Sequence, residues 1–225
     1  MLCSLKEFEG YHLAAEDGVF GTVDDVLFDD EHWTVRYLVV KTGPWLLGRK
    51  VLIWSRAVSA PDWENRTIRT TLTRDEIRAA PDFDTDAPVS RQRERELLAY
   101  YGWSPYWYPT APVPIPADES ADTHLRSLRA VTEYRVAGND GDIGDVSDLI
   151  VDPGAWVIWF VAVVVGRTLA PRVVLVAPGW VGNIDWSLRR VQVSLSRQQI
   201  VQAPEYRDRG HHDTGQTPSL PVTQP

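Results

Sequence analysis

The sequence predicts an all-β protein made of two tandem copies of one small β-barrel or sandwich domain. The first observation is an internal repeat: when Leu2 is placed on Leu125, the chain aligns with itself without a gap as far as Phe83 and Tyr206, with about 25 identical pairs. The second is a series of short, Val-rich and aromatic runs separated by turn residues. Because the repeat is as long as a whole small domain, it indicates a duplicated folding unit.

In the first copy, Ser4–Glu7 has a capping-box pattern that predicts one helical turn. Glycines then precede a β-rich run over 23–28, and the acidic residues 29–31 predict the turn of a β-hairpin. The returning strand alternates, which predicts that Trp33, Val35, Tyr37 and Val39 share one core face. Arg36 then falls on the opposite face and is expected to be solvated.

A further apolar strand is predicted over 50–54, and residues 66–72 alternate before a second capping box at Thr73–Glu76. This box starts a short helix that Pro81 closes, and the second copy repeats it at Ser196–Gln199. Between the copies, Ser90 precedes a predicted helix over 91–101, followed by a stretch rich in proline and aromatic residues. The expected domains are therefore 1–84 and 124–207, with a linker over 85–123 and a disordered tail over 208–225.

Composition narrows the class of protein. With 225 residues, 44% hydrophobic and 24% charged, the chain is typical of a soluble globular protein. A net charge of -8 disfavours nucleic acid as a partner, because phosphate binding requires clustered Lys and Arg. Cys3 is the one cysteine and cannot form an internal disulfide, so we expect a cytoplasmic protein. The opening residues do not resemble a signal peptide, and the longest apolar run, 155–165, predicts a strand rather than a transmembrane segment.

Several motifs together resemble a known family. They are DG-x-x-G-x-V-x-D-x-x-x-D, W-x-x-R-Y-L-V-V-x-T-G, K-V-L-I and LTRDEI-x-x-x-P, with a linker SRQRERELLAYYGWSPYW between the copies. In these features the chain resembles the PRC-barrel family, and most closely its two-copy bacterial members. That family includes the cytoplasmic domain of the photosynthetic reaction-centre H subunit and the C-terminal domain of a ribosome-maturation factor. The resemblance implies two PRC-type β-barrels that dock onto larger assemblies and carry out no catalysis.

The second copy departs from the first in the strand that follows the hairpin. WTVRYLVVKTG becomes WVIWFVAVVVG, so Trp159 replaces Arg36 and Val164 replaces Lys41. We expect an outward apolar stripe here that another surface must cover. The candidate interface on this strand comprises Trp156, Trp159, Val161, Val163 and Val165. The first barrel, the linker, a second chain forming a homodimer and an external partner are the alternatives for its cover.

The aromatic linker is a second candidate interface, represented by Trp103, Tyr106 and Trp107, because Tyr and Trp dominate interface hot spots. The alternative is that these residues clamp the linker onto the barrels.

The remaining polar motifs fit structural roles. Residues 139–148 cluster Asp and Gly, but their spacing does not match a calcium loop, so they are interpreted as turn residues. Asp24, Asp25, Asp29, Asp30 and Glu31 are interpreted as turn and rim charges in the same way. The five histidines lack zinc spacing, and Cys3 has no evident base, so we expect no metal, no cofactor and no enzymatic activity.

The sequence therefore predicts a non-catalytic interaction or assembly module with an unknown protein partner. By resemblance, one partner is a membrane electron-transfer complex, to which the chain would bind peripherally. The alternative is a ribosome-assembly factor that binds a basic ribosomal protein, since an acidic chain would avoid the RNA itself. An enzyme of unknown activity is the remote alternative.

Overall fold

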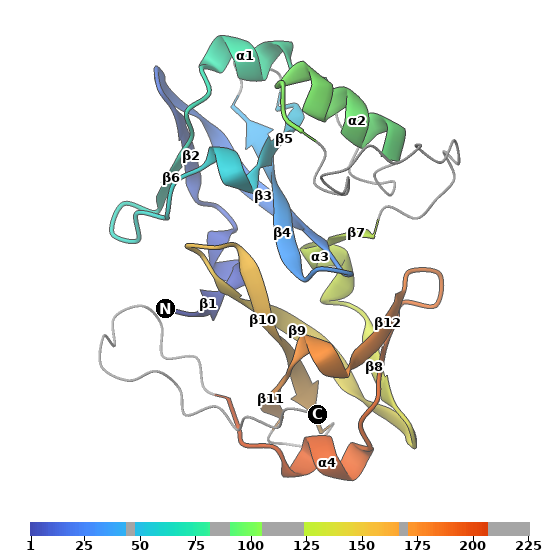
Figure 1. Cartoon of the computed structure of the whole chain (residues 1–225). Helices are drawn as coiled ribbons and strands as arrows, with labels where there is room; N and C mark the ends of the chain where they lie inside the picture. The colour runs from blue at the N-terminus through green and yellow to red at the C-terminus, as the bar shows by residue number, and fades with distance from the viewer. Residues whose placement is uncertain (44–47, 82–90, 105–123, 167–170, 207–225) are drawn as a thin grey trace.

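The computed structural model describes residues 1–43, 48–81, 91–104, 124–166 and 171–206 (Figure 1). The predicted tail, 208–225, lies outside these ranges, as do Tyr106 and Trp107 of the linker. Strands dominate the described residues, which confirms the all-β class. No helix in the described ranges combines the length and the apolar character needed to cross a membrane.

The first half of the chain contributes six strands to the structure. They are β1 (Cys3–Ser4), β2 (His12–Ala15), β3 (Gly18–Asp29), β4 (Thr34–Thr42), β5 (Lys50–Trp54) and β6 (Thr67–Arg69). The second half repeats the series as β7 (Leu125–Ser127), β8 (Arg135–Gly138), β9 (Gly141–Asp152), β10 (Val157–Val165), β11 (Arg172–Val176), β12 (Val181–Asp185) and β13 (Arg190–Val193). The extra strand arises because the chain after the 3₁₀ turn η4 (Pro178–Trp180) pairs as β12. The chain after the corresponding turn η3 (Ser55–Ala57) forms two isolated bridges instead, Val58↔Thr70 and Asp62↔Thr67.

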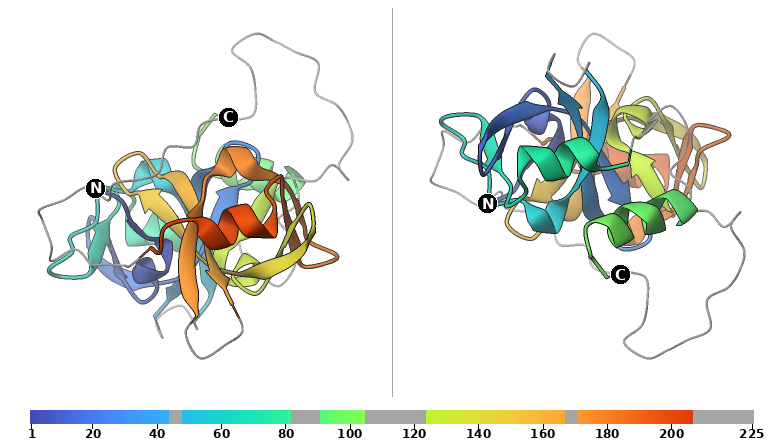
Figure 2. Two further views of the ribbon diagram at one scale, coloured as in Figure 1. Left: turned by 90° about the horizontal axis from the view of Figure 1, so that it is seen from below. Right: turned by 90° about the horizontal axis from the view of Figure 1, so that it is seen from above.

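Four α-helices and a third short turn complete the described elements. They are η1 (Leu5–Phe8), α1 (Arg74–Ala79), α2 (Arg91–Tyr100), α3 (Leu128–Val131) and α4 (Arg197–Gln202). Both predicted capping boxes are present: Thr73 with Glu76 opens α1, and Ser196 with Gln199 opens α4. Helices α1 and α2 lie side by side at one end of the molecule and α4 lies at the other end (Figure 2).

The strands form one hydrogen-bonded network through both halves. In the first half the order is β6-β2-β3-β4-β5, and in the second it is β12-β13-β8-β9-β10-β11. Among the described residues neither series closes into a complete ring: β5 and β6 share no ladder, although the bridge Val58↔Thr70 joins the segments beside them. The structure thus gives two open, strongly bent sheets that are joined at β4 and β10.

The two halves meet through equivalent residues. Thr34 of β4 pairs antiparallel with Val157 of β10, its own counterpart in the repeat. The backbone N–H of Val35 donates to the carbonyl of Trp156, and the N–H of Ile158 donates to the carbonyl of Trp33, each over 2.8 Å. An antiparallel pair of equivalent residues is the contact expected at a local twofold axis.

Each half also gives its first strand to the other half. β1 pairs with β9, aligning Ser4 with Ile150, and β7 pairs with β3, aligning Ser127 with Leu27. These are the same pairing in the two copies. The first strand of each repeat therefore belongs to the sheet of the opposite repeat, which the sequence boundaries at 84 and 124 do not anticipate.

A β-bulge in β4 overturns the prediction of a single core face. Phe28 pairs with Val35 but Leu27 pairs with Tyr37, so Arg36 is the extra residue. A bulge shifts the alternation by one residue, so side chains before and after it face opposite sides of the sheet. Val35 lies in the main core, whereas Tyr37 and Val39 lie in a separate cluster on the outer face.

The main core runs through both halves. It contains buried side chains of η1, β3 and β4 together with those of α3, β9, β10 and β13. Trp156 of the second half is 5% exposed and its ring lies 5.4 Å from that of Phe8 in the first half. The two repeats therefore share apolar surface that either would expose alone.

Close backbone approach requires a glycine at one matched position in each copy, Gly21 and Gly144. A Cβ at residue 144 would collide with the carbonyl oxygen of Val164 on the paired strand. We expect Gly144→Ala to lower the free energy of unfolding by about 1–3 kcal/mol, the usual cost of overpacking. Gly179→Ala is the control, because an added Cβ there meets no atom within 4 Å. Urea unfolding measures both, and equal stability of the two variants would contradict the steric argument.

Candidate functional site

In the first half, the side of the sheet that faces away from the main core is covered by other parts of the chain. We call it the first outer face, and its buried side chains are Leu27, Tyr37, Val39, Leu52 and Trp54. Leu97 of α2 and Leu125 of β7 join this cluster. The face is thus a largely apolar sheet surface that α2 covers.

The contacts of α2 combine apolar burial with one polar bond. Leu97 and Leu98 are almost completely buried. Glu94 is completely buried as well, and its Oε1 accepts a hydrogen bond of 2.9 Å from the hydroxyl of Tyr37. A buried carboxyl group needs such a donor to offset the loss of water. The predicted helix over 91–101 is therefore confirmed almost to the residue, and it packs on the first half.

Trp103 follows α2 and continues the same cover. Its ring stacks on Tyr101 at 4.4 Å and lies 4.9 Å from the ring of Trp54. Burial raises the pKa of the Tyr101 hydroxyl. Of the aromatic linker residues proposed as an interface, Trp103 packs on the first outer face; the positions of Tyr106 and Trp107 lie outside the described residues.

The corresponding face of the second half is built by the equivalent strands but is less completely buried. We call it the second outer face: Ile150, Phe160, Ala162, Val164 and Leu175. By the repeat, Phe160 stands where Tyr37 stands and Leu175 where Leu52 stands. Ile150 and Ala162 are each only 2% exposed, but Phe160, Val164 and Leu175 are partly exposed, unlike Tyr37 and Leu52. Among the described residues, none of these five belongs to either buried cluster.

Most of the residues predicted to form an outward apolar stripe on β10 do not face outward. The β10 bulge places Ile158 opposite Val151 and Phe160 opposite Ile150, so Trp159 is the extra residue. Val161, Val163 and Val165 consequently point into the main core, where Trp156 also lies. Trp159 alone of the predicted stripe is exposed, at 50%. The apolar residues of β10 on the outward face, besides Trp159, are Phe160, Ala162 and Val164, none of which was in the candidate interface.

Arg36, at the equivalent bulge of the first half, is buried and not solvated as predicted. Its Nη2 lies 2.7 Å from Oδ2 of Asp29, which is itself 2% exposed. Asp29 also accepts hydrogen bonds from the backbone of Glu31 and His32. Burial alone would raise the pKa of Asp29, but its hydrogen bond from Arg36 and those from the backbone hold it below the usual value.

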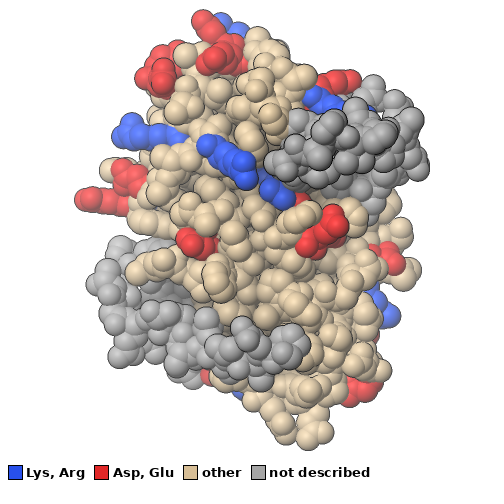
Figure 3. Space-filling model, in the orientation of Figure 1, with Lys and Arg blue, Asp and Glu red and all other residues tan. Residues whose placement is uncertain are grey.

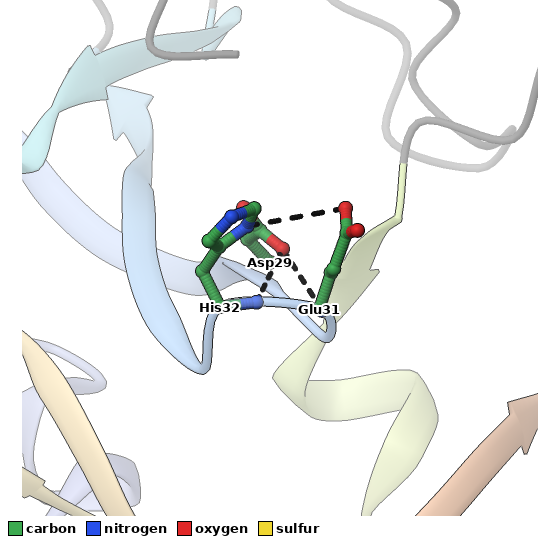
Figure 4. Close-up of side chains that lie close together, drawn as sticks. All are labelled: Asp29, Glu31 and His32. Atoms are coloured by element: carbon green, nitrogen blue, oxygen red, sulfur yellow. Dashed lines mark hydrogen bonds and ion pairs between the residues drawn. The ribbon is translucent and has the colours of Figure 1, made fainter. Parts of the chain in front are cut away.

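Asp29, Glu31 and His32 lie close enough together to suggest cation ligands (Figure 4). The hydrogen bonds give them a different role. Nδ1 of His32 contacts Asp29 Oδ2 at 3.0 Å, and Arg36 already supplies that oxygen with a positive charge. Asp29 therefore fixes the turn of the hairpin, with Glu31 and His32 on its exposed rim.

Two aspartates that the sequence suggested were turn or rim charges instead bridge the halves. Asp25 accepts hydrogen bonds from the Ser127 hydroxyl (2.5 Å) and the backbone N–H of Arg129 (3.1 Å). Asp148 accepts the equivalent bonds from the Ser4 hydroxyl and from the N–H of Lys6. Ser4 therefore forms no capping box with its own turn, contrary to prediction. The sequence offered one signal for these contacts: the serine and the aspartate are identical in the two copies.

Clefts with mixed polar and apolar linings also border the junction. One, of about 430 Å³, is lined by residues that include Asp30, His124 and Asn183. There, Oδ2 of Asp30 forms an ion pair with Nε of Arg126 over 2.7 Å, and Oδ1 of Asp30 lies 2.8 Å from Nδ1 of His124. On the face shown in Figure 3, Lys and Arg side chains lie among acidic ones rather than in one basic patch of described residues.

Cys3 is placed for packing rather than for chemistry. It is 3% exposed, its Sγ lies 3.7 Å from the carbonyl oxygen of Val151, and burial raises the pKa of its thiol. A thiol held in its neutral form is a poor nucleophile. The sequence matches no model of a known protein family, and a search of curated proteins finds no match to it either.

Proposed function

We propose that this chain is a non-catalytic protein-interaction module of the PRC-barrel type, made of two small barrels related by a local twofold axis. The barrel interpretation is supported by the order of strands in each half. In the second half, the segment after β11 turns at η4 and returns to the sheet as β12 beside β13. In the first half, the bridge Val58↔Thr70 lies at the matching place.

One observation carries the functional proposal: equivalent apolar faces are buried to different extents. The first outer face is buried beneath α2, whereas Phe160, Val164 and Leu175 of the second outer face are partly exposed. Trp159, the residue before Phe160, is half exposed. An apolar sheet surface with adjacent exposed tryptophan is the kind of surface that protein partners bury.

Site-specific photo-cross-linking in the native cell tests this proposal. A benzophenone amino acid at position 160 preserves the aromatic character of the site, and we expect it to form an adduct with a different protein. The same group at Val201, an exposed residue of α4, is the control. Leu175→Glu should abolish the adduct at 160 because it introduces a charge into the apolar contact.

The products discriminate among the candidate partners. A component of a membrane electron-transfer complex and a ribosomal protein are the two classes that the family resemblance implies. An adduct with a second copy of this chain would make the face a homodimer contact, and so contradict the proposal of an external partner. Equal labelling from positions 160 and 201 would contradict it as well.

A further inference from the structure

The two outer faces are built by equivalent pairs of strands. On the first, Tyr37 pairs with Leu27 and Trp54, and Val39 pairs with Leu52. On the second, Phe160 pairs with Ile150, and Ala162 pairs with Leu175. The bulges at Arg36 and Trp159 stand at the same point of each strand. The two faces therefore present the same sheet geometry.

The first face shows which kind of element this geometry accepts. Its cover is α2, whose Leu97 is fully buried in the cluster. The helix also places Glu94 against Tyr37, so its contact stripe contains one acid that accepts a hydrogen bond from the sheet. An amphipathic helix with a leucine stripe is thus a cover that the chain itself demonstrates.

The second face differs where α2 makes its polar contact. Phe160 has no hydroxyl with which to bond a buried carboxylate, and Val164 replaces Lys41 at the rim. Ala177, in place of Trp54, leaves more room. Burying an unpaired carboxylate is costly, so a helix that fits this face needs an apolar residue at the position of Glu94.

The sequence of the segment that follows the second repeat does not predict a helix equivalent to α2. The last described residue, Tyr206, donates its N–H to the carbonyl of Val173 at the edge of β11. In the sequence beyond it, Pro218 and Pro221 stand where the repeat register puts Arg95 and Leu98 of α2. Proline in a helix interior removes a hydrogen bond and clashes with the preceding turn, so this segment does not encode a second α2.

We propose that the second outer face binds an amphipathic helix of a protein partner, seated as α2 is on the first outer face and carrying an apolar residue where α2 has Glu94. This inference rests on the proposed function and specifies the partner's secondary structure and its side chain against Phe160.

The test uses the whole chain and two synthetic peptides with the sequence of residues 90–104. One keeps Glu94 and the other carries Glu94→Leu. We expect the Leu peptide to bind the wild-type chain about tenfold or more tightly than the Glu peptide, by calorimetric titration. Chemical-shift changes should centre on the amides of Ile150, Ala162 and Leu175.

A substitution that restores the hydroxyl gives the sharper readout. In the Phe160→Tyr chain the Glu peptide should gain about fivefold or more in affinity, because the Tyr37–Glu94 bond can then be recreated. Val164→Lys should weaken binding of the Leu peptide, because it places a charge at the apolar contact. The variant should fold, since the first repeat has lysine at the matching position 41. Val201→Lys, on exposed α4, is the matched control and should change neither affinity.

Failure of the inference is separable from failure of the proposed function. No saturable binding of the Leu peptide, or binding that neither Phe160→Tyr nor Val164→Lys alters, would overturn the helix inference. If position 160 still cross-links to a partner protein in that case, the interaction module stands and its partner docks by another structure. Loss of both results removes both proposals.

Discussion

Trp156→Ala is expected to lower the free energy of unfolding by about 3–5 kcal/mol, the range found when a buried Trp or Phe is truncated. The indole is buried in the core that both halves share, next to the ring of Phe8. Its removal leaves a cavity at the junction that the rigid strands on either side cannot fill. The backbone there has φ of +57°, so the tryptophan is held in a left-handed conformation by the fold.

The matched control is Trp33→Ala, the equivalent residue of the first half. Trp33 also has a positive φ, but it is only partly buried and stacks on Phe28 at 6.0 Å, so we expect a smaller loss. Urea unfolding followed by circular dichroism gives both values. Native-state hydrogen exchange should show amides of Leu38 and Val163 losing protection together in Trp156→Ala. Loss of protection at Val163 alone would contradict a core shared by the two halves.

The sequence predicts the elements of this fold better than the faces they present. Capping at Thr73 and Ser196, the linker helix and the hairpin strands follow from local patterns, and each is present in the structure. The bulges at Arg36 and Trp159 have no signature in alternation, because a run of apolar residues looks the same in either register. One extra residue in each strand was enough to exchange the predicted inner and outer faces.

The contacts between the two repeats could not be predicted from the sequence either. Ser4 and Asp148 each fit a local role, as a helix cap and as a turn residue, and alternation contains nothing about a partner in the other half. The exchange of β1 and β7 becomes visible only when the strands are paired in space. Of the candidate interface on β10, Val161, Val163 and Val165 were therefore expected on the outward face, whereas they belong to the main core.

Arg36→Ala is expected to destabilise the protein by about 3 kcal/mol at neutral pH, because it leaves the Asp29 carboxylate buried without its cation. Both side chains are less than a tenth exposed, and their atoms lie 2.7 Å apart. The matched control is Arg190→Ala. Arg190 pairs with Asp142 at 3.1 Å, but both side chains are more than 40% exposed, so its loss should cost less than about 1 kcal/mol.

The pH dependence separates loss of charge pairing from loss of packing. In the wild type the pKa of Asp29 is lowered, so its stabilising contribution is complete above the unfolded pKa near 4 and disappears as pH falls through the folded value. In Arg36→Ala, burial without the cation should raise the folded pKa above the unfolded one, and ionisation then opposes folding. The deficit of the variant should therefore be largest near pH 7 and shrink as the pH falls below about 4. It should be smallest below the lowered pKa of Asp29 in the wild type, where Asp29 is protonated in both proteins. Urea unfolding at several pH values measures this deficit. A deficit that stays constant over the range would show that Arg36 stabilises the protein through packing of its aliphatic stem and not through its charge.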